Sequence, residues 1–160
     1  MSAPKRIPVL WYLLLWIAFI VLVGVLPLRN FVGHSHWEHI KWLPTAEDLI
    51  SPKYLVDIGS DLVGNTLLFL PLGFFLSRLL SPASVRRQLL VAACVSGLLS
   101  FSIEFYQVYC HNRFPSFFDV ITNITGAFLG VWCARRNVSI MHQPRPASFT
   151  PIPPDRTLVP

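Results

Sequence analysis

Apolar residues in this chain gather into four long runs, and the segments between the runs carry most of the charged and polar positions. The runs cover residues 9–26, 62–80, 89–109 and 117–133. Each is close to the ~20 residues that a helix needs to cross the hydrocarbon core of a bilayer. None alternates with a period of two, as a half-buried strand would. The pattern therefore predicts an all-α fold, a four-helix transmembrane bundle.

The composition supports this prediction and excludes several other classes. Hydrophobic residues make up 53% of the 160 positions and charged residues only 13%, whereas a soluble domain carries about 25% charged residues. The mean hydropathy is +0.54. Such a chain cannot cover a water-exposed surface, and its composition excludes disorder, collagen and a coiled coil. We therefore predict the lipid bilayer as a partner, and we find no motif for a cofactor.

The basic residues indicate an orientation for the helices. The formal net charge is +5, but no basic stripe with interleaved aromatic residues suggests nucleic-acid binding. Nine of the 13 Lys and Arg residues lie in the N-terminus, near the 81–88 loop or in the C-terminal tail, and four lie in the other connections. The positive-inside rule then places the N- and C-termini in the cytoplasm. The 29–60 and 110–116 loops are expected to face outward.

The segments outside the runs complete the predicted organisation. The first run is longer than the apolar part of a signal peptide and lacks an A-x-A-like cleavage site after it, so we expect a retained helix. Residues 1–136 form one predicted membrane domain. Residues 137–160 contain six prolines and are expected to be a disordered cytoplasmic tail. The 29–60 outer loop is polar and aromatic, and part of it is expected to lie flat on the membrane as a short amphipathic helix.

The three cysteines are expected to be small packing residues. Cys94 and Cys133 fall in the inner half of their helices, and Cys110 falls at the outer end of the third. Only Cys110 is expected on the outer, oxidising side of the membrane, so it has no cysteine partner there for a disulfide. No C-x-x-C spacing exists, so no zinc site is indicated. An exposed Cys110 would react with a membrane-impermeant maleimide in intact cells.

Three of the predicted helices carry, in or directly beside their apolar runs, pairs of polar residues that a membrane helix normally avoids. Each pair is spaced i,i+3 or i,i+4 and therefore shares one helical face. At 1.5 Å per residue, each pair reaches roughly 6 to 9 Å from the outer end of its helix. The pairs are Asp61 and Asn65, Glu104 and Gln107, and Asp119 and Asn123. Six polar groups are thus expected to converge on one layer near the outer surface.

Small residues on the same faces indicate that this layer looks into the bundle. Gly126 and Gly130 form a G-x-x-x-G that continues the Asp119–Asn123 face, and small residues in membranes mark the face that packs against other helices. Arg113, in the connection between the third and fourth helices, is expected to reach the layer and pair with Glu104 or Asp119. The sequence therefore predicts an outward-facing polar pocket.

Each of these residues also has a purely structural interpretation. Ser116-x-x-Asp119 has the spacing of a capping box, so Asp119 could serve only to cap the fourth helix. Asp61 follows Ser60 at the expected start of the second helix, where an acid is favoured by the helix dipole. The two asparagines could be interhelical hydrogen-bonding groups. Glu104 is the hardest to explain structurally, because acids within the membrane are costly and usually functional.

The outer loop contains a second polar pattern. His34, His36 and His39 form H-x-H-x-x-H, with Glu38 between them. A metal site needs convergent geometry and supporting groups as well as ligands, so we predict no metal from the spacing alone.

The order of the polar residues resembles one membrane family. The pattern is Asn65-x-x-x-Phe69-x-Pro71-x-Gly73, Glu104-x-x-Gln107, and then Arg113, Asp119, Asn123 and Gly126. It is similar to that of the VanZ-like family and covers roughly residues 15–135. The resemblance implies a multi-pass protein of the bacterial cytoplasmic membrane. The family's namesake is associated with low-level resistance to the glycopeptide teicoplanin, and the resemblance implies no particular reaction.

Three functional hypotheses follow. The first is a cell-envelope factor that binds a lipid or lipid-linked cell-wall precursor headgroup, or a glycopeptide, in the outward pocket. The second is a membrane hydrolase or transferase with Glu104 or Asp119 as general base and Arg113 as anion stabiliser. The third is a small proton-coupled exporter that uses Glu104 as proton carrier. The candidate ligand-binding residues are Asp61, Asn65, Glu104, Gln107, Arg113, Asp119 and Asn123.

Overall fold

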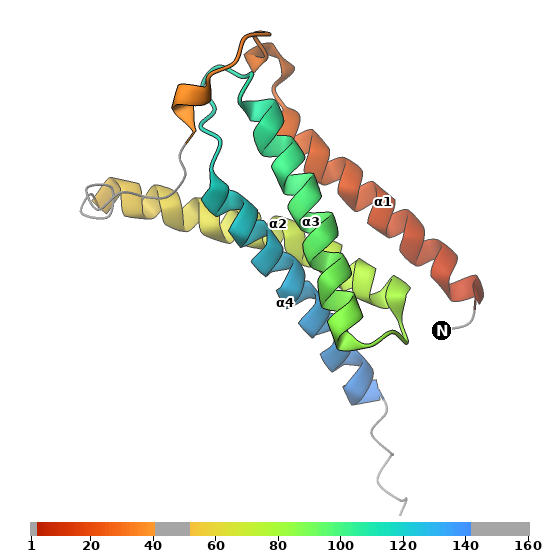
Figure 1. Cartoon of the computed structure of the whole chain (residues 1–160). Coiled ribbons are helices and arrows are strands. Elements are labelled where there is room, and N and C mark those ends of the chain that lie inside the picture. Colours follow the sequence, from red (N-terminus) through yellow and green to blue (C-terminus); the bar gives the residue numbers. More distant parts are fainter. Residues whose placement is uncertain (1–2, 41–51, 142–160) are drawn as a thin grey trace, which may run out of the picture.

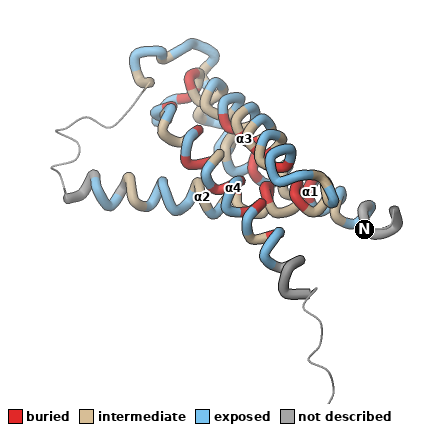
Figure 2. The backbone as a smooth tube through the Cα atoms, turned by 60° about the horizontal axis from the view of Figure 1, so that its bottom comes forward, coloured by how far each residue is buried: buried red, intermediate tan, exposed pale blue. Residues whose placement is uncertain are grey.

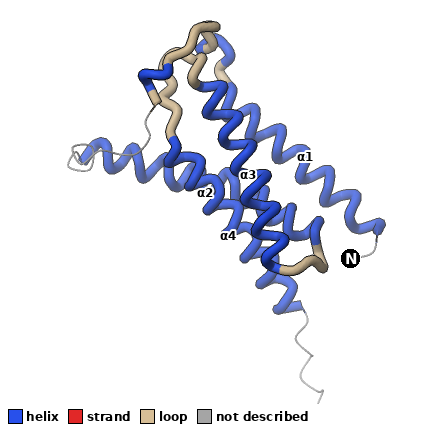
Figure 3. The backbone as a smooth tube through the Cα atoms, in the orientation of Figure 1, coloured by secondary structure: helices blue, strands red, loops and turns tan. Residues whose placement is uncertain are grey.

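The structure, a computed structural model, describes residues 3–40 and 52–141 and consists of helices joined by short connections (Figures 1 and 3). The long helices are α1 (Ala3–Val25), α2 (Pro52–Leu80), α3 (Val85–Gln107) and α4 (Phe117–Met141). All four are long and apolar enough to cross a membrane. The described residues form no strand beyond one isolated bridge between Phe31 and Cys110. The predicted all-α, four-helix transmembrane fold is confirmed.

Two helix boundaries differ most from the sequence prediction. We expected the second helix to start at Leu62, but α2 begins ten residues earlier, at Pro52. Proline favours the first position of a helix, because its missing N–H has no partner there in any case. Asp61 therefore lies inside α2, and the interpretation of Asp61 as an acid at the helix N-terminus is wrong. At the other end of the chain, α4 continues through Arg135 and Arg136 to Met141, because basic residues mark the membrane edge without ending a helix.

The other expectations about loop and tail are only partly covered by the described residues. Residues 28–40 contain two short 3-10 helices, Leu28–Asn30 and Trp37–His39. Residues 41–51 of the 29–60 loop, part of which is expected to form an amphipathic helix, and residues 142–160 of the expected tail lie outside the described residues.

The helices are not all parallel. In Figure 1, α2 lies obliquely across α3 and α4, and α1 runs along the far side of α3. The first residues of α1 and the last residues of α4 lie toward the same end of the bundle. This agrees with four membrane crossings, while the assignment of that end to the cytoplasm stays a prediction.

Glycines allow α2 and α4 to touch through their backbones. A Cβ atom on Gly73 of α2 would run into the carbonyl group of Ala127, and one on Gly126 of α4 would run into that of Thr66. Gly130 meets the carbonyl of Leu70 in the same way. The predicted packing face at Gly126 and Gly130 is therefore confirmed, and α2 and α4 form the most extensive helix pair in the structure.

Burial follows the pattern of a membrane protein. A compact core contains Ile20, Phe69, Leu72 and Val131, all at most 1% exposed, and it lies where the helices meet (Figure 2). Large apolar side chains such as Leu98, which is 69% exposed, cover the outside of the helices. A soluble protein does not expose apolar surface on this scale, so the outer surface fits contact with lipid.

A polar network closes the end of the bundle where α2 turns into α3. The Ser77 hydroxyl donates to Gln88 Oε1 at 2.7 Å, and Gln88 Nε2 donates to the carbonyl of Ala83 at 3.0 Å. Arg135 Nη1 of α4 lies 3.5 Å from Gln88 Oε1. The network ties three helices together at the end opposite the predicted polar layer.

Candidate functional site

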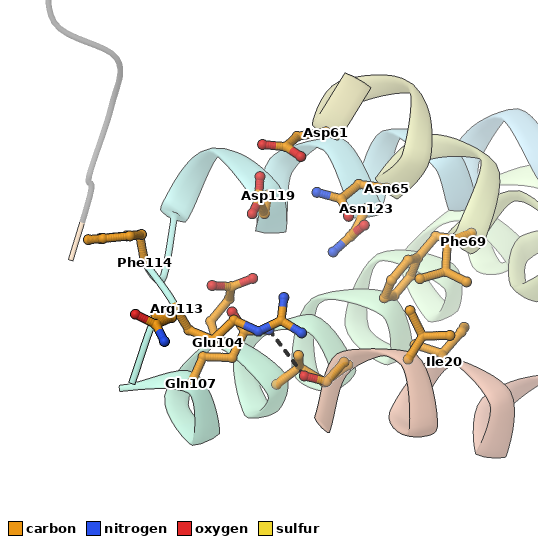
Figure 4. A pocket seen from close by; sticks show the side chains of 15 residues that line it. Ile20, Asp61, Asn65, Phe69, Glu104, Gln107, Arg113, Phe114, Asp119 and Asn123 are labelled. Atoms are coloured by element: carbon orange, nitrogen blue, oxygen red, sulfur yellow. Dashed lines mark hydrogen bonds between the residues drawn. The ribbon is translucent and has the colours of Figure 1, made fainter. Parts of the chain in front are cut away.

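One cavity of about 330 Å3 collects the polar residues of α2, α3 and α4. It lies where the last turns of α1 and α3 meet the first turn of α4 and the middle of α2 (Figure 4). All seven candidate residues line it: Asp61, Asn65, Glu104, Gln107, Arg113, Asp119 and Asn123. The predicted convergence of these side chains is therefore observed, while their role in binding a ligand stays a prediction. We refer to this space as the polar cavity.

The α2–α4 wall of the polar cavity carries two facing carboxyl groups. Asp61 on α2 and Asp119 on α4 point toward each other in Figure 4, close enough for their charges to interact. The Asn65 side chain, one turn further along α2, lines the same wall and points toward Asp119 in Figure 4. Amide and carboxyl groups from two helices thus form one hydrogen-bonding surface.

Glu104 reaches across the cavity to the start of α4. Its Oε2 accepts a hydrogen bond from the backbone N–H of Ser116 at 2.9 Å. In a capping box this N–H would instead be bound by the side chain of Asp119. The capping-box interpretation of Ser116 and Asp119 is therefore wrong, because an acid from α3 takes the position. The Asp119 carboxyl is left to face Asp61 and the cavity.

Arg113 lies in the cavity but does not form the expected ion pair. In the described part of the chain no ion pair joins Arg113 to Glu104 or Asp119, so the predicted pairing of Arg113 with either acid is wrong. Arg113 Nη2 instead donates to the carbonyl of Leu26 at 2.8 Å. The last carbonyls of a helix have no partner within it, and basic side chains often bind them.

Gln107 fixes the same end of α1. Its Nε2 donates to the carbonyl of Gly24 at 3.2 Å. Together with the Arg113 contact, this bond anchors the end of α1 to α3 and to the α3–α4 connection. Both residues therefore line the cavity while also holding its wall in place.

Asn123 presents an unpaired acceptor. The side chain is 5% exposed, and its Nδ2 donates to Ser100 Oγ at 2.7 Å. This contact joins α4 to α3, as the interhelical interpretation expected. Its Oδ1 is buried and has no hydrogen-bond partner among the described residues. A buried carbonyl oxygen without a donor is costly, so this atom is suited to a hydroxyl or N–H group of a ligand.

The charges in the polar cavity are predominantly acidic. Three carboxyl groups and one guanidinium line it, and Glu104 is near enough to both Asp119 and Arg113 to interact with their charges. No Ser, Cys or His is found among the described residues of the lining. Chemically, the cavity can accept hydrogen bonds at several positions and can hold one anionic group at Arg113.

An apolar groove adjoins the polar cavity and shares Glu104 with it. Its volume is about 240 Å3. Its walls are formed mainly by aromatic and aliphatic side chains, including Trp37, Phe101, Phe105 and Phe117. Three of these belong to α3 and α4 and one to the α1–α2 connection. A ligand with a polar and an apolar part could therefore meet both surfaces at Glu104.

Sequence reasoning missed some residues of this region. Ser100, one turn before Glu104 on α3, was not recognised as the partner of Asn123. Asn112 and Phe114, which line the cavity beside Arg113, carry no sequence signal. The cysteine expectation also changes, since Cys110 is 2% exposed and its Sγ lies 3.6 Å from the carbonyl of Tyr106. Cys110 is thus a packing residue, as expected, but it cannot serve as an accessible label.

Four membrane-spanning helices around a polar cavity define a multi-pass integral membrane protein. Comparison with known families matches residues 9–141 to VanZ/LLP1. The chain belongs to this family, and the resemblance inferred from the polar residues is confirmed. The matched range includes every residue that lines the polar cavity. No curated protein and no solved structure matches the chain.

Proposed function

We propose that this protein is a cell-envelope factor of the bacterial cytoplasmic membrane whose polar cavity binds the headgroup of a lipid-linked cell-wall precursor. In this way it would change the sensitivity of the cell to glycopeptides of the teicoplanin type. The observation that carries the proposal is the convergence of seven polar side chains from four segments on one intramembrane cavity. Polar groups within a membrane are expensive to place and are usually retained for function.

The size and chemistry of the cavity support a sugar- or peptide-bearing headgroup. Its volume of about 330 Å3 lies at the lower end of the ~300–1,000 Å3 that small-molecule sites occupy. Carboxyl and amide oxygens accept hydrogen bonds from hydroxyl and amide groups, and the free Oδ1 of Asn123 is one such acceptor. Arg113 is the only positively charged side chain among the described residues that line the cavity, which suits a phosphate at one position.

The apolar groove supports a lipid-linked ligand rather than a free one. It is lined by Phe101, Phe105 and Phe117 and meets the polar cavity at Glu104. A prenyl or acyl chain in this groove would keep its headgroup at the mouth of the cavity. A soluble sugar or peptide has no apolar chain to place in the groove, and ordinary membrane lipid would fill it instead.

Binding to the purified full-length chain in lipid nanodiscs tests the proposal. The probes are a polyprenyl-diphosphate-linked disaccharide pentapeptide and the corresponding polyprenyl phosphate without sugar. We expect the first to bind at least about tenfold more tightly, because a site built to hydrogen-bond a group discriminates strongly against an analogue that lacks it. Native mass spectrometry and a competition assay measure both affinities. Equal affinities for the two probes would contradict the headgroup assignment.

Substitutions separate the cavity from the rest of the bundle. Glu104→Gln keeps the shape and an acceptor for Ser116 but deletes the charge, so we expect normal accumulation in the membrane and a loss of binding of about tenfold or more. Ser102→Ala is the matched control, since Ser102 lies on an exposed face of α3 and donates only to the Leu98 carbonyl at 2.7 Å. In cells, Glu104→Gln should lose the glycopeptide phenotype and Ser102→Ala should retain it. Full phenotype in Glu104→Gln would rule the cavity out as the functional site.

A membrane enzyme is the second candidate, and the facing carboxyl groups of Asp61 and Asp119 favour it over the exporter. Two carboxyl groups that share one site are a common arrangement for moving a proton to or from water. Turnover of the same lipid-linked probe, lost in Asp119→Asn, would support it. The exporter is less favoured, because apolar core residues such as Leu72 and Val131 separate the polar cavity from the Gln88 network at the other end.

A further inference from the structure

Two connections far apart in the sequence are joined next to the polar cavity. The backbone N–H of Val32 donates to the carbonyl of Tyr109 at 3.0 Å, and that of His36 donates to the carbonyl of Val108 at 2.8 Å. The N–H of His111 donates to the carbonyl of Asn30 at 2.7 Å. These bonds hold residues 30–36 against residues 108–111 in a fixed register.

This register gathers four of the five histidines of the chain. The ring centroid of His36 lies 4.6 Å from that of His34 and 4.9 Å from that of His111, and the rings of His34 and His111 are 5.5 Å apart. The ring of His39 stacks on His36 at 4.9 Å. We call these four residues the histidine cluster.

The histidine cluster has the geometry of a metal site. One nitrogen from each of His34, His36 and His111 lies within 4.8 Å of the others. In a tetrahedral Zn2+ site with bonds of about 2.0–2.1 Å, ligand nitrogens are roughly 3.3 Å apart. His34 and His111 are exposed, so small side-chain rotations can close the remaining gap.

The hydrogen bonding of His36 is incomplete in the way that a metal ligand requires. The His36 side chain is 12% exposed, and its Nδ1 lies 3.3 Å from Oε1 of Glu38. Its Nε2 is buried and has no hydrogen-bond partner among the described residues. Histidines that bind a metal through one nitrogen typically hold a carboxylate or carbonyl with the other. Glu38 is placed to do this for His36.

We propose that His34, His36 and His111 bind a divalent transition-metal ion, with Zn2+ as the first choice, and that Glu38 orients His36. Neutral imidazole nitrogens suit Zn2+, and three such ligands leave a fourth position open for water or a ligand. The site is separate from the polar cavity but next to it, because Asn112 and Arg113 directly follow His111 and line that cavity. A bound ion would therefore clamp the connection that carries Arg113.

Metal binding to the full chain in detergent, freed of metal by chelation, tests the proposal. We expect one equivalent of Zn2+ by titration calorimetry, and a Zn2+-dependent rise in the unfolding temperature, since a ligand that binds only the folded state stabilises it. His36→Ala and His111→Ala should weaken Zn2+ binding by at least about tenfold. His142→Ala, at the fifth histidine, is the matched control and should bind as the wild type does. Binding that survives His111→Ala, or that falls equally in His142→Ala, overturns the proposal.

Further variants at Glu38 and His34 secure the interpretation. Glu38→Gln should weaken Zn2+ binding by a smaller factor than removal of His36, because an orienting group acts only through its ligand. If Glu38→Gln abolished binding while His34→Ala did not affect it, the ligands would be His36, Glu38 and His39, and the proposed set would be wrong. His34→Gln at an exposed position gives a ligand variant that does not depend on core packing. The unfolding temperature without metal establishes that each variant is folded.

Discussion

The backbone contact between α2 and α4 gives a sharp test of the fold. A Cβ atom on Gly73 would meet the carbonyl group of Ala127, with the carbonyl carbon at 2.6 Å and Cα at 2.8 Å. The two backbones would have to separate by about 1 Å to reach ordinary carbon–carbon contact at ~3.5–4.0 Å. Neither helix can yield locally, because the atoms in the way belong to the backbone.

The expected cost follows from two opposing effects. Overpacking typically costs about 1–3 kcal/mol, and a clash with backbone belongs at the upper end of that range. Replacing glycine by alanine inside a helix raises the free energy of unfolding by about 0.5–1 kcal/mol. We therefore expect Gly73→Ala to lower the free energy of unfolding by about 2 kcal/mol.

Two glycines in the same bundle provide controls. A Cβ on Gly97 would lie 3.5 Å from Ile124 Cδ1, an ordinary contact, and one on Gly64 would meet nothing within 4 Å. Gly97→Ala and Gly64→Ala should therefore be neutral or more stable by up to about 1 kcal/mol. Unfolding in mixed detergent micelles, followed by circular dichroism, measures all three variants. If Gly73→Ala is as stable as Gly97→Ala, the close approach of α2 and α4 is refuted.

Two other predictions concern the cap of α4 and the orientation of the chain. Glu104→Ala removes the acceptor of the Ser116 N–H and should lower the free energy of unfolding by about 1–3 kcal/mol. Glu104→Gln retains an acceptor and is the control. Equal unfolding midpoints for the two variants would contradict the role of Glu104 as the cap of α4. Because Cys110 is buried, orientation needs new labels in a background without native cysteines. Ser35→Cys should react with an impermeant maleimide on intact cells, and Ser84→Cys only after permeabilisation. The opposite labelling pattern would reverse the assigned orientation.

The helices and the polar cavity could be predicted because both depend on local periodicity. Spacing of three or four residues places Asp61 with Asn65 and Asp119 with Asn123 on single faces, and the depth of each pair follows from the helical rise. Topology then brings the pairs to the same end. The start of α2 was missed because the continuous apolar run begins only at Leu62, after Gly59, Ser60 and Asp61, although Pro52 is a residue type that favours helix starts.

The contacts that could not be predicted join residues distant in the sequence. The spacing of Ser116 and Asp119 correctly marks a helix start, but Glu104 competes for the same N–H from another helix. No local rule ranks two such acceptors. Likewise, His111 comes to lie beside His36 through backbone bonds between two connections that have no periodic pattern.

The dominance of the α2–α4 pair has a consequence for biosynthesis. Chains are made from the N-terminus, so α2 enters the membrane when α1 is its only neighbour, and its glycine face and Asn65 have no lasting partner. The Asp119 side chain and the Gly126 surface that complete this face are translated last. The nascent protein therefore passes through a stage in which polar and closely packing groups of α2 face lipid or a chaperone. Ribosomes that stall before residue 117 should leave a chain that membrane proteases recognise as unfinished.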